Sequence, residues 1–196
     1  IYTLSLHDAL PISENIKGGN LLDTGLIHIY CGDGKGKTTA SLGLALRCAG
    51  RGGRILFAQF LKGRPTGELT SLAQIPAITV LRGKAILKFT FQMTDDEKRE
   101  TKEAQTDLFH KVCAFCFDQK PDLVVCDELV GASALGLVPE EEVRRFLQEK
   151  PAKTEVVLTG RNPSQALIDL ADYVSEIQKI KHPFDRGIPA REGIEE

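Results

Sequence analysis

The chain has 196 residues, and its 25 lysines and arginines nearly balance its 27 aspartates and glutamates, giving a formal net charge of −2. This length favours one domain, or one domain with small additions. The charge balance gives no field that calls for nucleic acid or an anionic membrane, and no apolar run approaches the roughly 20 residues of a membrane-spanning helix.

The N-terminal residues are set apart from the rest. Residues 1–13 (IYTLSLHDALPIS) have neither the basic segment nor the continuous apolar segment of a signal peptide. They resemble the in-frame translation of a sequencing-library adapter, so we expect a non-native leader there. Residues 14–24 are expected to form an untethered leader, and residues 25–196 a single domain.

From residue 26 onward, short apolar runs typical of β-strands alternate with helical patterns. Strands are expected over residues 26–31, 54–60 and 78–81, and apolar residues with helical spacing indicate a helix over residues 38–49. Glycine 50 is a stop signal for this helix.

The alternation continues in the second half of the chain. A long helix is predicted to begin at Thr94, which has the spacing of a capping box with Glu97. Further helices are expected to begin at Pro139 and at Asn162-Pro163. Strands are expected over residues 122–126, 154–158 and 173–180. Strands that alternate with helices predict an α/β fold with a mostly parallel central sheet.

A glycine- and lysine-rich loop separates the first predicted strand from the first predicted helix. It consists of Gly32, Asp33, Gly34, Lys35, Gly36, Lys37, Thr38 and Thr39. Its glycines let backbone N–H groups converge on an anion, and the start of the helix adds partial positive charge. Lys37 can reach phosphate oxygens, and the Thr38 hydroxyl can bind Mg²⁺. We therefore predict an ATP-binding loop.

This loop departs from the usual G-x-x-x-x-G-K-[ST] pattern, because Cys31 stands where the first glycine is required. The loop is thus one residue tighter, and Lys35 is an additional cation. The Asp33 carboxylate would repel a triphosphate, so it either accepts N–H bonds within the loop or faces away. These departures predict a nucleotide held differently from that in common P-loop ATPases.

Two carboxylates, Asp127 and Glu128, follow the apolar strand predicted at residues 122–126. At the end of a strand beside the phosphate loop they can bind Mg²⁺ together with Thr38. Acidic residues after strands are also commonly solvated or start helices. Glu128 can alternatively activate water, which keeps an ATP-hydrolysing function open.

The five cysteines are scattered, which favours reduced thiols in a cytoplasmic protein over a disulfide framework. Cys113 and Cys116 form a C-x-x-C, but they lie on the long helical pattern and no second pair has metal-ligand spacing. We expect a structural role for both.

Several segments resemble the P-loop type of cob(I)alamin adenosyltransferases, the ATP:corrinoid (cob(I)yrinic acid a,c-diamide) adenosyltransferases. They are GDGKGKTT, QFLKG (residues 59–63), VVCDE, LTGRNP (residues 158–163) and KHPFDRGIPAREGIE (residues 181–195). The resemblance runs from Gly25 to the C-terminus, and it implies a RecA-like P-loop fold and a homodimer.

The implied reaction transfers the 5′-deoxyadenosyl group of ATP to Co(I) of a reduced corrinoid and releases triphosphate, in adenosylcobalamin biosynthesis or salvage. Backbone amides of the loop, Lys35, Lys37 and a Mg²⁺ held by Thr38 and Glu128 suit the charge that develops on the leaving group. No side-chain nucleophile is required, because the cobalt attacks. The resemblance also implies that ATP lies reversed in the loop.

The same resemblance places the corrinoid against Phe89 and Phe91, an aromatic-Thr-aromatic patch that favours loss of the lower axial ligand. Relatives often carry Trp at the second aromatic position. An electron-donor flavoprotein is a further expected partner. In the alternative interpretation, both phenylalanines are core residues on a strand.

Two rival functions stay open at this point. One is a RecA-like P-loop ATPase, in which Arg161 would sense phosphate, although no basic stripe marks a nucleic-acid track. The other is a carrier that binds ATP or a corrinoid without turnover.

Overall fold

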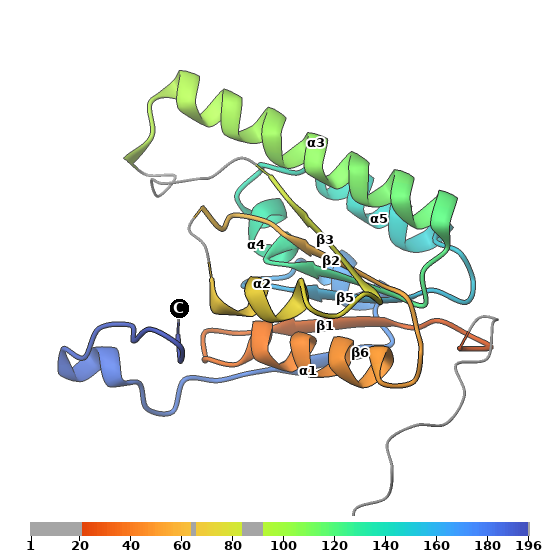
Figure 1. The fold of residues 1–196 in the computed structure, drawn as a ribbon. Helices are drawn as coiled ribbons and strands as arrows, with labels where there is room; N and C mark the ends of the chain where they lie inside the picture. Colours follow the sequence, from red (N-terminus) through yellow and green to blue (C-terminus); the bar gives the residue numbers. More distant parts are fainter. Residues whose placement is uncertain (1–20, 64–65, 84–91, 196) are drawn as a thin grey trace, which may run out of the picture.

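A parallel sheet forms the centre of the computed structural model, which describes residues 21–63, 66–83 and 92–195 (Figure 1). Its strands are β1 (Ile27–Cys31), β2 (Ile55–Gln59), β3 (Ile78–Arg82), β4 (Leu123–Asp127), β5 (Glu155–Thr159) and β6 (Tyr173–Glu176). Their order across the sheet is β3-β2-β4-β5-β1-β6, and every neighbouring pair is parallel. The predicted α/β fold is confirmed.

Helices cover both faces of the sheet. They are α1 (Lys37–Ala49), α2 (Gly67–Leu72), α3 (Asp95–Gln119), α4 (Leu129–Ala134), α5 (Glu140–Glu149) and α6 (Gln165–Leu170), followed by the 3₁₀ helix η3 (Pro183–Arg186). One core joins α3, α4, α5 and α6 to one face of the strands, and a second core joins α1 and α2 to the other face. Figure 1 shows α3 and α5 on the side of the sheet opposite α1.

The central strands are buried on both faces, as near-continuous apolar runs predict for a covered parallel sheet. All five positions of β2 and of β4 are buried. Within β4, Val124 and Cys126 contribute to the core beneath α3, whereas Leu123 and Val125 contribute to the core above α1. This burial places the carboxyl end of β4, with Asp127, between the two layers.

The helix starts agree only in part with the prediction. The capping box is confirmed: Thr94 Oγ1 accepts the Glu97 N–H at 3.3 Å, and Glu97 Oε2 accepts the Thr94 N–H at 2.8 Å. The start at Asn162-Pro163 was wrong, because α6 is capped by Ser164, whose Oγ accepts the Leu167 N–H at 3.2 Å. Pro139 precedes α5 as its N-cap residue instead of forming the first turn.

The described end of the expected leader is attached to the domain. The Leu21 N–H donates to Asp122 Oδ1 at 2.7 Å, and Asp122 Oδ2 accepts the Arg54 N–H at 2.8 Å. The expectation of an untethered segment therefore does not hold for Leu21, because its backbone shares a carboxylate with the start of β2.

Cys113 and Cys116 lie on α3 as free thiols. Burial raises the pKa of Cys113 to about 12 and that of Cys116 to about 11, so both are protonated at neutral pH and unreactive. Within the described residues, no group of three or more His, Cys, Asp or Glu is arranged to hold a metal ion. These observations favour the structural role.

Candidate active site

The glycine- and lysine-rich loop connects β1 to α1, and its glycines have different tasks. Gly32 and Gly36 adopt φ values of 102° and 122°, which disfavour side chains. A Cβ on Gly32 or on Gly34 would lie 2.4 or 2.7 Å from the carbonyl oxygen of Ile177, whereas one on Gly36 would meet no heavy atom within 4 Å. Two glycines thus make room for the chain's own backbone, and Gly36 keeps the cavity side of the loop open.

Lys37 is held inside the loop, where its side chain is almost completely buried. Its Nζ donates to the Gly34 carbonyl oxygen at 2.8 Å, and burial lowers its pKa. Lys35 is half exposed, and its Nζ lies 3.6 Å from Glu195 Oε1. The buried cation is therefore preorganised within the loop, whereas Lys35 is solvated and held by an exposed ion pair.

The Asp33 carboxylate has a hydrogen-bond partner outside its own loop. Its Oδ1 accepts the Lys179 N–H at 3.0 Å, and this hydrogen bond is the main cause that lowers the pKa of Asp33. The Gly34 N–H donates to Ile177 O at 2.7 Å. Two hydrogen bonds thus join the loop to the segment that follows β6. The Gly34 N–H of the loop is therefore not free to bind phosphate.

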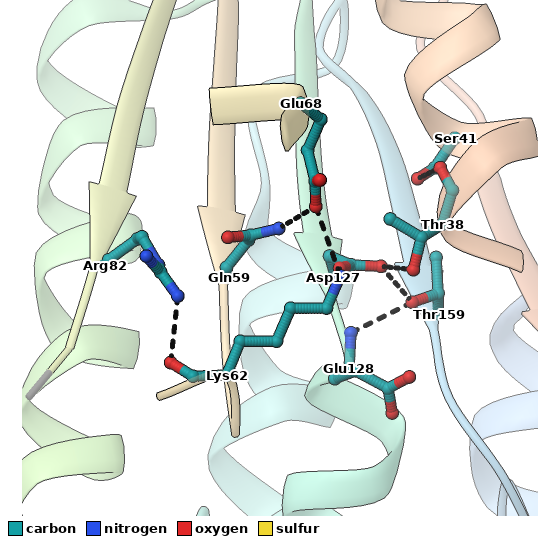
Figure 2. Close-up of polar contacts among 9 residues, drawn as sticks. All are labelled: Thr38, Ser41, Gln59, Lys62, Glu68, Arg82, Asp127, Glu128 and Thr159. Carbon is teal, nitrogen blue, oxygen red and sulfur yellow. Dashed lines mark hydrogen bonds and ion pairs between the residues drawn. The ribbon is translucent and has the colours of Figure 1, made fainter. Parts of the chain in front are cut away.

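Asp127 ends β4 with a fully buried side chain. Its Oδ1 accepts hydrogen bonds from Thr38 Oγ1 at 2.9 Å and from Thr159 Oγ1 at 2.8 Å (Figure 2). Its Oδ2 lies 2.9 Å from Lys62 Nζ. Oδ1 therefore has two hydrogen-bond donors and Oδ2 has an ion-pair partner, and the predicted proximity of Thr38 to Asp127 is present.

Glu128 differs from its neighbour in backbone and in surroundings. It adopts a left-handed conformation (φ 63°, ψ 14°), and its N–H donates to Thr159 Oγ1 at 2.9 Å. Strain of this kind clusters at functional sites. Burial, followed by the negative charge of Asp127, raises the pKa of Glu128. Its carboxylate faces the cavity, where Lys37, Lys62 and Arg161 oppose that rise.

The donors at this site fit a magnesium ion shared with phosphate oxygens. A hydroxyl oxygen that donates its proton to Asp127 still has lone pairs for a cation, and Thr38 is in that state. The Glu128 carboxylate lines the same cavity. Mg²⁺ is usually held by one or two protein oxygens together with substrate phosphates and water. Since Lys62 already contacts Asp127, the arrangement favours Thr38 and Glu128 as direct ligands.

A cavity of about 670 Å³ opens in front of the loop. Every loop residue from Asp33 to Thr39 lines it, together with a second set from distant parts of the chain: Lys62, Thr66, Gly67, Glu68, Ser71, Glu128, Arg161, His182, Gly193, Ile194 and Glu195. The contributions of Lys62 and Glu68 were not anticipated. Lys62 lies in the QFLKG segment, which suggested no role by itself, and Glu68 lies outside every segment that carried the resemblance.

The predicted corrinoid-contacting residues, Phe89 and Phe91, lie outside the described residues. In the part of the chain that is described, no helix is both long and apolar enough to cross a bilayer.

Comparison with known proteins identifies the family of the chain. The family model for the ATP:corrinoid adenosyltransferases BtuR/CobO/CobP matches residues 23–195. The chain belongs to this family. It is 35% identical over 175 residues to the corrinoid adenosyltransferase of Escherichia coli K12, covering 88% of this chain and 86% of that protein. It is 36% identical over 189 residues to the Sinorhizobium corrinoid adenosyltransferase, covering 93% and 85%.

Among solved structures, this adenosyltransferase family member shares its fold with parts of two larger cytoplasmic domains. The cytoplasmic domain of EssC superposes with a TM-score of 0.50 at 17% identity over 87% of this chain. The type VII secretion ATPase EccC of Thermomonospora curvata gives 0.51 at 13% identity over 85% of this chain. The chain spans only 34% and 22% of those proteins, so the likeness concerns the fold alone.

Proposed function

We propose that this enzyme transfers the 5′-deoxyadenosyl group of ATP to Co(I) of a reduced corrinoid and releases intact triphosphate. The observation that carries the proposal is the arrangement of positive groups around the cavity. A buried Lys37, an exposed Lys35 and the start of α1 surround a cavity large enough for a triphosphate. Family membership supplies the reaction class.

In this reaction the Co(I) electron pair forms the cobalt–carbon bond at C5′, and the C5′–O bond breaks with its electrons passing to the triphosphate. Negative charge therefore develops on the leaving group, and no side-chain base is needed. Lys37 stabilises that charge once it exchanges the Gly34 carbonyl for a phosphate oxygen. The positive end of α1 acts in the same direction. A reversed orientation of ATP suits a loop one residue shorter than the common motif.

Mg²⁺ is proposed as the cofactor, with Thr38 and Glu128 as its protein ligands. When bound, it would neutralise part of the phosphate charge. Asp127, predicted as a third ligand, accepts a hydrogen bond from the Thr38 hydroxyl and so orients the threonine. This division of roles follows from the partners that each oxygen already has.

On the corrinoid side, Phe89 and Phe91 are proposed to exclude water from the lower face of the cobalt. The Co(II) precursor needs one electron before it can attack, which is the reason for proposing an electron-donor flavoprotein as partner. We also propose a cytoplasmic homodimer. The large apolar side chains exposed on β6 and the C-terminal segment support an assembly: Tyr173, Val174, Ile180 and Phe184.

The test is incubation of the protein with ATP, MgCl₂ and chemically reduced cobalamin, followed by absorption spectroscopy. The proposal predicts an ATP-dependent spectrum of a new cobalt–carbon bond. The alternative, in which Glu128 activates water, predicts phosphate release without any corrinoid. Phosphate release without corrinoid would show that the protein is a hydrolase and not a transferase. If neither product forms, the protein would be a carrier that binds its ligands without turnover.

A further inference from the structure

The side chain of Lys62 bridges two carboxylates at the edge of the cavity. Its Nζ lies 2.9 Å from Asp127 Oδ2 and 3.4 Å from Glu68 Oε1 (Figure 2). Glu68 Oε1 in turn accepts a hydrogen bond from Gln59 Nε2 at 2.8 Å. Burial lowers the pKa of Lys62, but the two carboxylates outweigh this effect and raise it overall. Lys62 is therefore a cation fixed between β4 and α2.

Asp127 depends on this cation. Its side chain has no exposed area, and Thr38 and Thr159, its hydrogen-bond donors at Oδ1, are both neutral. Within the described residues, Lys62 alone lies within ion-pair distance of Asp127. A buried carboxylate whose only cation is removed is strongly disfavoured. Lys62 is thus the cation that compensates the buried Asp127 carboxylate beneath the phosphate loop.

The backbone around Lys62 is built to hold this arrangement. Leu61 adopts a left-handed conformation (φ 57°), a costly state for a residue with a side chain. The Leu61 N–H donates to Gln105 Oε1 at 3.0 Å, and Arg82 donates to the Lys62 carbonyl oxygen at 3.1 Å. The turn that follows β2 is therefore fixed on both sides, and it directs Lys62 across to the end of β4.

We propose that Lys62 is a positioning residue for the triphosphate end of ATP, acting through Asp127 on the Thr38 hydroxyl. The inference rests on the proposed function and adds a residue to its machinery. Because Lys62 compensates the charge of Asp127 at Oδ2, Oδ1 stays turned toward Thr38. The Thr38 proton is then directed to Asp127, and its oxygen lone pairs are free for the ligand side.

The experiment is a double-mutant cycle on ATP affinity, measured by calorimetry in MgCl₂ on the full chain. Its members are wild type, Lys62→Met, Asp127→Asn and the double variant. Loss of a supporting residue of this kind typically costs about 10- to 100-fold, which is the expected weakening in Lys62→Met. In the Asp127→Asn background, removal of Lys62 should cause no further loss, because Lys62 acts through Asp127. In the double variant position 127 is neutral, and Glu68, which also loses Lys62, keeps its hydrogen bond from Gln59, so this comparison holds even if Lys62→Met does not fold.

A variant that keeps the positive charge distinguishes a positioning role of Lys62 from a purely structural ion pair. Lys62→Arg keeps the charge and should bind ATP within about threefold of wild type, with a similar kcat. Lys111→Met is the matched control, since it removes an exposed ion pair with Asp107 and should change nothing. If Lys62→Met weakened ATP binding equally in the wild-type and the Asp127→Asn backgrounds, the proposal would be overturned. Lys62 would then act on the nucleotide independently of Asp127. An effect on melting temperature alone would also overturn it.

Failure of the proposed function is seen separately. If the wild-type chain forms no cobalt–carbon bond, the transferase assignment falls, while the binding cycle still reports how Lys62 acts on ATP.

Discussion

At the scale of single residues, Lys37 and Lys35 carry the same charge in different settings. Lys37 is buried and bound to the Gly34 carbonyl, whereas Lys35 is half exposed and its Nζ lies 3.6 Å from Glu195. Interactions preorganised in a water-poor site stabilise developing charge more than flexible, solvated ones do. The two lysines are therefore not equivalent, although the sequence places them two positions apart.

Lys37→Ala is expected to lower kcat/KM by about 10²- to 10³-fold, the usual cost of removing one preorganised donor. The fold should persist, because the hydrogen bond that the Lys37 side chain makes within the described residues goes to its own loop. Lys35→Ala is the matched comparison and should lose distinctly less. Steady-state kinetics with reduced cobalamin, together with circular dichroism, measure both effects. Equal losses in the two variants would contradict the difference in preorganisation.

At the scale of elements, the segment after β6 docks on the phosphate loop. Ile177 O accepts the Gly34 N–H, and the Ile177 N–H donates to the Cys31 carbonyl oxygen at 2.8 Å. Figure 1 shows this segment (blue) passing the end of α1 where the loop lies. The shortened loop is therefore completed by a part of the chain about 140 residues away, since β6 pairs with β1.

Gly34→Ala tests this docking. The new Cβ would lie 2.7–2.8 Å from backbone atoms of Ile177 and Gln178, which cannot be relieved by rotating a side chain. Overpacking of this kind costs about 1–3 kcal/mol, and each kcal/mol lowers Tm by roughly 2–4 °C in a domain of this size. Scanning calorimetry should show the loss, and limited proteolysis should cut the C-terminal segment faster.

The control is Gly43→Ala, because Gly43 lies within α1 and a Cβ there would meet nothing within 4 Å. Alanine is a better helix former, so this variant should be as stable as wild type or more stable. If Gly34→Ala behaved like Gly43→Ala, the contact between the loop and the C-terminal segment would not contribute to stability.

At the scale of the whole molecule, local patterns predicted the sheet and the loop but not the full site. Apolar runs and the Thr94 capping box depend on neighbouring residues, so they can be read directly. The six-residue helices α2 and α4 are too short for a periodic signal and form through tertiary packing. The role of Lys62 follows from the pairing of β2 with β4, which aligns Gln59 with Asp127 across 68 positions.

The strand order therefore assembles the site from five regions: the loop after β1, the turn and α2 after β2, the end of β4, Arg161 after β5 and the segment after β6. Parallel strands bring their carboxyl ends to one edge of the sheet, where ligands of open α/β folds bind. Each of these regions contains a segment that carries the family resemblance in the sequence. Their mutual contacts required the fold.

The central claim is that the site serves a whole triphosphate as leaving group. The most direct measurement is phosphorus-31 NMR of a complete reaction with ATP and reduced cobalamin. We expect one tripolyphosphate for each cobalt–carbon bond formed, with no orthophosphate or pyrophosphate appearing before it. Orthophosphate released in step with ATP loss, with or without corrinoid, would contradict it.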